Sequence, residues 1–141
     1  MCIILDANML SRFKKRADED MRPVWHWLSK ENSKIAYSTT EKFKDEWTKG
    51  GGDNILRELE RSKKLKSVSN ECVLEIQKEL EDRIESNDSH IIALAIVAKA
   101  KRLVSSDRDL CTDFKNSNLV GGKVYQNKTH AHLLRRYHCP D

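Results

Sequence analysis

Four short aliphatic runs, spaced widely along the chain, constrain the fold more than any other feature of the sequence. The first, CIILD at positions 2–6, is rich in β-branched residues and has the length of a strand buried on both faces. Similar runs occupy positions 34–38, 102–105 and 123–126. Segments with helical patterns separate them. This alternation predicts an α/β fold, a single three-layer domain with a central parallel sheet flanked by helices.

Two of the intervening segments show their helical character clearly. Positions 89–100 are apolar nearly all round, which indicates a helix in the centre of the domain. Another segment carries aliphatic residues three or four positions apart, as on one face of an amphipathic helix: Val73, Ile76, Leu80 and Ile84.

The length and composition favour one soluble domain. The chain has 141 residues without a linker or repeat, so we expect a single domain over 1–141 with a basic tail at 127–141. No apolar run approaches the roughly 20 residues that span a membrane. The start lacks the features of a secretory signal and the four cysteines are scattered, which predicts a cytoplasmic protein. The net charge of +4 is compatible with a polyanionic partner.

Acidic residues gather where predicted strands end. The stretch LVSSDRDLCTDF, positions 103–114, contains Asp107, Asp109 and Asp113, and Asp6 ends the first strand. Ligands of parallel α/β sheets bind at the carboxyl ends of the strands. We therefore expect Asp6, Asp107 and Asp109 at one edge of the sheet, and Asp113 on the surface.

Two further acids belong to predicted helices. Phe43 and Trp47 define the buried face of the helix after the second strand, and Glu46 lies about 60° from Phe43, at the border of that face. The other two acids of this helix, Glu41 and Asp45, should face solvent. Asp88 precedes the central helix; the strand-edge rule alone assigns it to the opposite edge, and a helix N-cap is an alternative role for it.

Several carboxylates in one cleft require compensation. Two unit charges about 4 Å apart repel by about 4 kcal/mol at an effective dielectric constant near 20. Such a group either takes up protons or binds a cation. Carboxylates without imidazole or thiolate favour a hard divalent ion, Mg²⁺ or Mn²⁺.

Four motifs in order resemble those of PIN-domain nucleases: IILDANML, FKDEW, NDSHIIALA and LVSSDRDL. The resemblance covers roughly residues 1–126. It implies a sheet of strand order 3-2-1-4-5 and a metal-dependent endoribonuclease of the kind found as the toxin of toxin–antitoxin pairs or in defence and processing systems. It also assigns the site. The catalytic acids would be Asp6, Glu46, Asp88, Asp107 and Asp109, and the metal ligands Asp6, Asp88, Asp107 and Asp109, with Asn8 and Ser106 in support.

The resemblance also implies an RNA substrate, hydrolysed with Mg²⁺ or Mn²⁺, and raises an antitoxin or a second copy of the chain as protein partners. Alternatives remain open at this point. They are a catalytically silent or partner-held PIN-fold binding module, a DNA-directed nuclease, and a phosphatase-type or receiver-type domain with a phosphorylated aspartate. A zinc site in the tail is a further alternative, with the candidate ligands His130, His132, His138 and Cys139.

Overall fold

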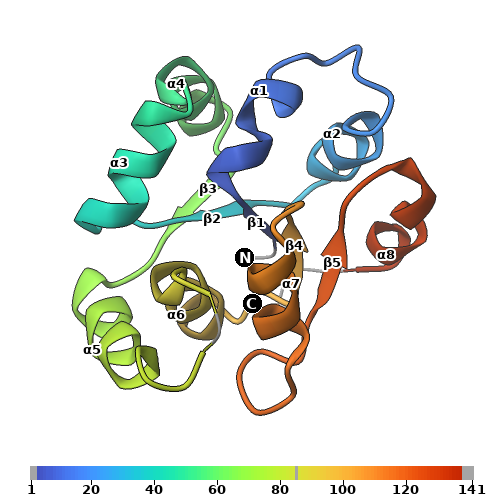
Figure 1. Cartoon of the computed structure of the whole chain (residues 1–141). Coiled ribbons are helices and arrows are strands. Elements are labelled where there is room, and N and C mark those ends of the chain that lie inside the picture. Colours follow the sequence, from blue (N-terminus) through green and yellow to red (C-terminus); the bar gives the residue numbers. More distant parts are fainter. Residues whose placement is uncertain (1–2, 85, 138–141) are drawn as a thin grey trace.

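The computed structural model describes residues 3–84 and 86–137, and its centre is a sheet of five parallel strands (Figure 1). The strand order is β3-β2-β1-β4-β5. The predicted fold class and strand order are therefore confirmed. The strands are β1 (Ile3–Leu5), β2 (Ile35–Tyr37), β3 (Leu65–Ser67), β4 (Arg102–Val104) and β5 (Lys123–Tyr125).

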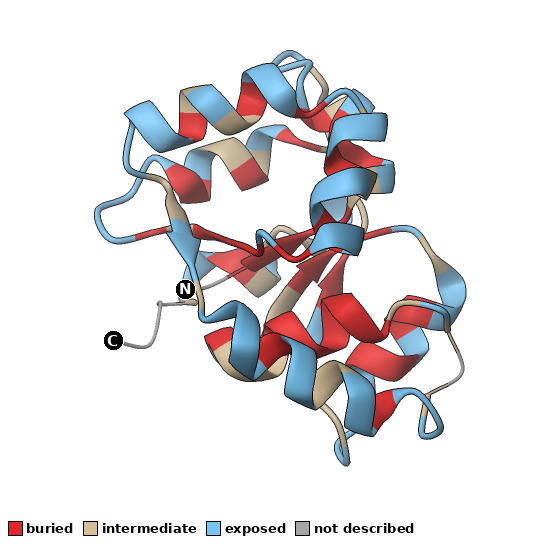
Figure 2. Cartoon of the chain, turned by 90° about the vertical axis from the view of Figure 1, so that its left-hand side faces the viewer, coloured by how far each residue is buried: buried red, intermediate tan, exposed pale blue. Residues whose placement is uncertain are grey.

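Helices cover both faces of the sheet, which forms a buried layer between them (Figure 2). One face carries α1 (Leu10–Phe13), α2 (Arg22–Leu28), α3 (Glu41–Lys49) and α4 (Asp53–Arg61). The other face carries α5 (Asn70–Leu80), α6 (Ser89–Ala98) and α7 (Arg108–Lys115). The last helix, α8 (His132–Arg135), packs against α2. The result is the three-layer arrangement that the alternation of strands and helices predicts.

The aliphatic runs form the strands because they are buried from both sides. Every residue of β1 and β2 is buried, and α6 is buried along most of its length, as its apolar composition predicts. Two details differ from the prediction. The edge strand β3 has the sequence LKS and is half-buried to exposed, so no aliphatic run marks it. The stripe of α5 continues to Ile84 in sequence, but the helix ends at Leu80 and Ile84 packs against the core from the following segment.

The central strand β1 pairs in parallel with β2 on one side and with β4 on the other, with Leu5 opposite Val104. The chain leaves β1 toward α1 on one face and leaves β4 toward α7 on the other (Figure 1). In α/β proteins, such a reversal of winding is expected to leave a crevice at the carboxyl ends of the two strands. This crevice is the place where a ligand site is expected. Among the described helices, none has the length and apolar character needed to cross a membrane.

Candidate metal centre

Asp6 and Ser105 meet at the carboxyl ends of the two central strands. Asp6 follows β1 directly and is 8% exposed, and Ser105 follows β4 directly and is fully buried. The Ser105 hydroxyl donates a hydrogen bond of 2.7 Å to Asp6 Oδ2 and accepts one of 3.0 Å from the backbone N–H of Asp107. Ser105 thus links two of the predicted acids. Ser106, which we expected in a supporting role, is exposed.

Asp107 is held in place by the start of α7. It is the N-cap of this helix, and its Oδ1 accepts a hydrogen bond of 3.1 Å from the backbone N–H of Leu110. An N-cap aspartate satisfies one of the unpaired N–H groups of the first helical turn. One carboxylate oxygen is therefore engaged with the helix.

Glu46 reaches the crevice from α3, on the other face of the sheet from α6 and α7. Its side chain is 38% exposed, whereas Glu41 and Asp45 on the same helix are exposed to solvent. Phe43 and Trp47 are buried. The helical spacing had predicted this division.

Asp88 precedes the first residue of α6, and the strand-edge rule as we applied it placed this residue at the wrong edge. In a parallel sheet, the helix that leads into a strand runs antiparallel to it, so its N-terminus lies at the carboxyl edge. Asp88 is therefore at the same edge as Asp6 and Asp107, and all three carboxylates interact electrostatically. Its side chain caps no N–H of the described part of the helix, which leaves the carboxylate available to the crevice.

The pKa values show that the four acids share one electrostatic environment. The pKa of Asp88 is raised to about 6, mainly by burial and to a smaller extent by the charges of Asp6, Asp107 and Glu46, against the opposing effect of Lys42. Burial also raises the pKa of Asp6, with smaller contributions from Glu46 and Asp107, while the hydrogen bond from Ser105 lowers it. The acids from four separate segments thus repel one another in a partly dehydrated crevice.

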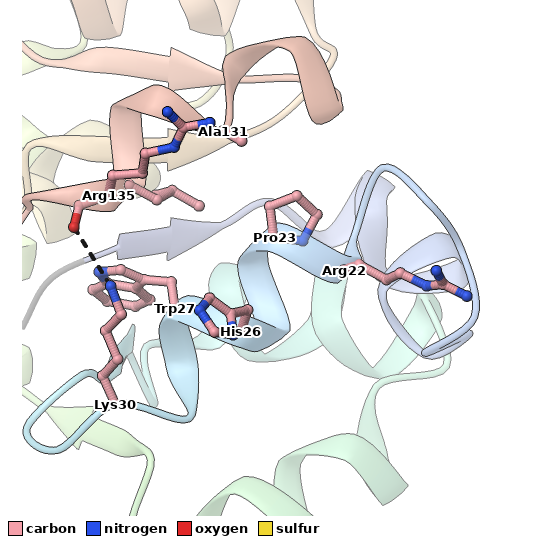
Figure 3. A pocket seen from close by; sticks show the side chains of 8 residues that line it. Arg22, Pro23, His26, Trp27, Lys30, Ala131 and Arg135 are labelled. Carbon is pink, nitrogen blue, oxygen red and sulfur yellow. Dashed lines mark hydrogen bonds between the residues drawn. The ribbon is translucent and has the colours of Figure 1, made fainter.

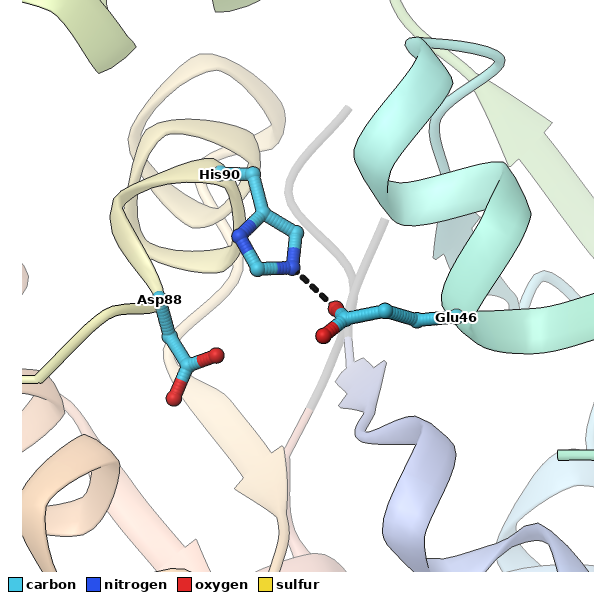
Figure 4. A group of neighbouring side chains, drawn as sticks. All are labelled: Glu46, Asp88 and His90. Carbon is cyan, nitrogen blue, oxygen red and sulfur yellow. Dashed lines mark hydrogen bonds and ion pairs between the residues drawn. The ribbon is translucent and has the colours of Figure 1, made fainter. Parts of the chain in front are cut away.

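His90 lies beside Glu46 and Asp88, although it was not among the site residues predicted from the sequence. One ligand atom each of Glu46, Asp88 and His90 lies within 4.8 Å of the others (Figure 4). The imidazole is fully buried, and its Nε2 contacts Glu46 Oε1. Burial lowers the pKa of His90, against the opposing effects of the Glu46 charge and of the hydrogen bond to Glu46. The signal in the sequence was a single imidazole in an otherwise apolar helix, two positions after Asp88.

Two other predicted residues are exposed to solvent. Asp109 is exposed in the first turn of α7, and Asn8 is exposed in the 3-10 helix that follows Asp6. The expectation for Asp113 was wrong. This residue is 3% exposed and accepts a hydrogen bond of 2.9 Å from the backbone N–H of Ser86, which secures the segment before α6.

In the described part of the chain, Glu46, Asp88 and His90 form a group that could hold a metal ion, and the charges of Asp6 and Asp107 act on Asp88. Oxygen ligands from Asp and Glu are those that Mg²⁺ and Mn²⁺ prefer, and a bound cation would relieve the repulsion that raises the pKa of Asp88. The proposed zinc site in the tail lies partly outside the described residues, since His138 and Cys139 are not described. His130 Nδ1 accepts a hydrogen bond of 3.0 Å from the backbone N–H of Gln126, and that bond uses one of its two nitrogens.

A second concave feature lies elsewhere, between α2 and α8 (Figure 3). Its floor includes Trp27 and Leu134, and its rim carries Arg22, Lys30 and Arg135. The Lys30 ammonium donates a hydrogen bond of 3.4 Å to the backbone carbonyl of Arg135 across this pocket. The residues that line it belong to other elements than the acids of the crevice.

Comparison with known proteins adds no relative. No family model, no curated protein and no solved structure matches this chain. A functional assignment therefore depends on the sheet topology, on the acids gathered at its carboxyl edge, and on the four sequence motifs.

Proposed function

We propose that the protein is a metal-dependent endoribonuclease of the PIN-domain type. The observation that carries the proposal is the convergence of Asp6, Glu46, Asp88 and Asp107 at the carboxyl ends of β1 and β4, where burial first and then the charges of the other three acids raise the pKa of Asp88 to about 6. These are four of the five catalytic acids that the resemblance assigns. The strand order is also the one that the resemblance implies.

In this proposal the acids divide the work of holding a cation. Asp6, Asp107 and Glu46 act electrostatically on Asp88, and Asp109 is exposed in the first turn of α7. Mg²⁺ or Mn²⁺ bound there would polarise a phosphodiester oxygen and lower the pKa of a water, which is the chemistry that hydrolysis of RNA requires. Ser105 fixes the Asp6 carboxylate through its 2.7 Å hydrogen bond.

Lys42 supplies positive charge next to the acids. Its ammonium donates a hydrogen bond of 2.7 Å to the backbone carbonyl of Asn87, and it acts electrostatically on Asp88 and His90. A cation at this border can contact a phosphate that flanks the scissile bond. The net charge of +4 supports a polyanionic substrate.

The biological setting follows from the resemblance alone. We propose a cytoplasmic enzyme that acts on RNA, with an antitoxin or a second copy of the chain as candidate partners. A silent or partner-held PIN-fold module and a DNA-directed nuclease are the competing functions, and the same assay separates them.

The test is cleavage of a fluorescently labelled RNA and of a DNA of the same sequence, in Mn²⁺, Mg²⁺ or EDTA. We expect RNA cleavage that requires the cation and falls at least 100-fold in Asp6→Asn and Glu46→Gln, because each substitution removes a charged ligand. Glu41→Gln is the matched control, since Glu41 lies on the same helix but faces solvent.

The other outcomes decide against the proposal in different ways. Cleavage of DNA alone would establish the DNA-directed alternative. Binding of Mn²⁺ and RNA without cleavage would favour the silent module. Equal activity of Asp6→Asn and the parent protein would show that the crevice is not the catalytic site.

A further inference from the structure

The Glu46 side chain is 38% exposed, and the buried imidazole of His90 contacts its carboxylate. Its side chain extends from α3 toward α6, where His90 Nε2 contacts Oε1 (Figure 4). The other carboxylate oxygen, Oε2, is not engaged by this contact. An exposed glutamate has several free rotamers, so a fixed partner is needed to hold it over the crevice.

The His90 ring is itself fixed. It is fully buried, and it packs edge-on against Phe43, with ring centroids 6.4 Å apart and an interplanar angle of 74°. Phe43 lies one turn before Glu46 on α3. The imidazole therefore contacts α3 twice, through the aromatic ring of Phe43 and through the carboxylate of Glu46.

The hydrogen-bond chemistry determines which nitrogen of His90 carries the proton. A carboxylate only accepts hydrogen bonds, so Nε2 must be the donor to Glu46. Nδ1 is buried and finds no hydrogen-bond partner among residues 3–84 and 86–137. A proton on Nδ1 would be a buried donor without an acceptor, which favours the neutral ring with Nε2 protonated.

This arrangement argues against His90 as a direct ligand. Nε2 contacts Glu46, and Nδ1 is buried without a hydrogen-bond partner among the described residues. If a metal bound Nε2, the neutral ring would carry its proton on Nδ1, which has no hydrogen-bond acceptor among the described residues. A ligand histidine almost always donates its second N–H to an acceptor.

We propose that His90 is a positioning residue, which donates Nε2–H to Glu46 Oε1 and thereby presents Oε2 to the divalent cation. The inference rests on the proposed function, because it assigns a role toward the same cation. Partners that orient a metal-binding carboxylate commonly contribute a factor of 10 to 100 in metal affinity. We expect the whole effect of His90 on metal affinity to act through Glu46.

The test uses Mn²⁺ alone, whose electron paramagnetic resonance reports both binding and nitrogen coordination. His90→Leu removes the donor, and His90→Gln keeps an N–H near the position of Nε2. His90→Asn is the matched control, because its amide reaches only the position of Nδ1. We expect Mn²⁺ affinity to fall 10-fold to 100-fold in His90→Leu and His90→Asn and to be largely retained in His90→Gln.

A double substitution shows whether the effect passes through Glu46. In a Glu46→Ala background, His90→Leu should cause no further loss of Mn²⁺ affinity. An equal loss in both backgrounds would overturn the inference, as would unchanged affinity in His90→Leu and His90→Asn. Coupling of the Mn²⁺ signal to a nitrogen that disappears in His90→Leu would make His90 a ligand and also overturn it.

Failure of the proposed function gives a different result. If the parent protein shows no Mn²⁺ binding that depends on Asp6, both the proposed function and the inference are refuted. Normal Asp6-dependent binding with no effect at position 90 refutes the inference alone. Circular dichroism shows whether each variant is folded. Because His90 is replaced in three different ways, the test remains possible if one variant does not fold.

Discussion

Replacement of Asp88 by Asn should stabilise the cation-free protein at neutral pH. Asp88 is partly buried among three other acids, and its pKa is raised from 3.8 to about 6. The full difference corresponds to about 3 kcal/mol. Because solvent reaches part of the side chain and screens its charge, we expect about 1–2 kcal/mol. The Asp88 side chain makes no capping hydrogen bond to α6, so the substitution leaves the helix intact.

The pH dependence of this effect has a definite sign. The folded chain holds the Asp88 proton more tightly than the unfolded chain, so ionisation of this group lowers the free energy of unfolding as the pH rises. The loss begins near 3.8, the ordinary pKa, and is nearly complete above the folded pKa of about 6. Asp88→Asn should therefore be more stable than the parent protein at pH 7.5 and nearly equal to it at pH 4.

Urea denaturation in EDTA at both pH values, repeated with Mn²⁺ at pH 7.5, measures the effect. Mn²⁺ at 100 times its dissociation constant should stabilise the parent by about 2.7 kcal/mol and the variant by much less. A variant that is less stable than the parent in EDTA at pH 7.5 would refute the reasoning. So would a difference that does not change with pH.

Three further substitutions test other contacts of the structure. Ser105→Ala removes the buried donor to Asp6, so it should cost about 1–3 kcal/mol in urea denaturation and raise the pKa of Asp6, as followed by NMR titration. Lys42→Ala removes the cation that lowers the pKa of Asp88, so that pKa should rise, and RNA affinity should fall with a shallower salt dependence, whereas unchanged values would place Lys42 outside the site. Gly122→Ala would bring a Cβ within 2.9 Å of a backbone carbonyl and into contact with an aromatic ring, so the thermal midpoint should drop by several degrees, and an unchanged midpoint would contradict this packing.

Patterns with a strong physical cause predicted the fold well. Aliphatic runs become central strands because both faces of the sheet are covered, and the buried helix α6 follows from its apolar composition. The edge strand β3 was not predicted, since Leu65–Ser67 pairs on one side only and is half-buried to exposed. Its identity as a strand comes from pairing with β2, which no local pattern shows.

The site was predicted in outline, and its internal contacts were not. Asp6 and Asp107 follow from the strand ends, and Glu46 follows from helical spacing. The roles of Ser105 and His90 depend on distances between segments far apart in the chain, which the sequence does not contain. Asp113 was misassigned because the sequence gives no sign of the hydrogen bond that its carboxylate accepts from the backbone N–H of Ser86.

The hydrogen bonds that hold Asp6, Glu46 and Asp107 have a consequence for how fast the site can fill. Each bond joins groups of the protein itself, so the proposed site would not require a segment to refold when an ion binds. Uptake and release should then be limited by diffusion and by exchange of the ion's own water shell. Backbone amide spectra of the empty and the loaded protein should differ only close to the crevice.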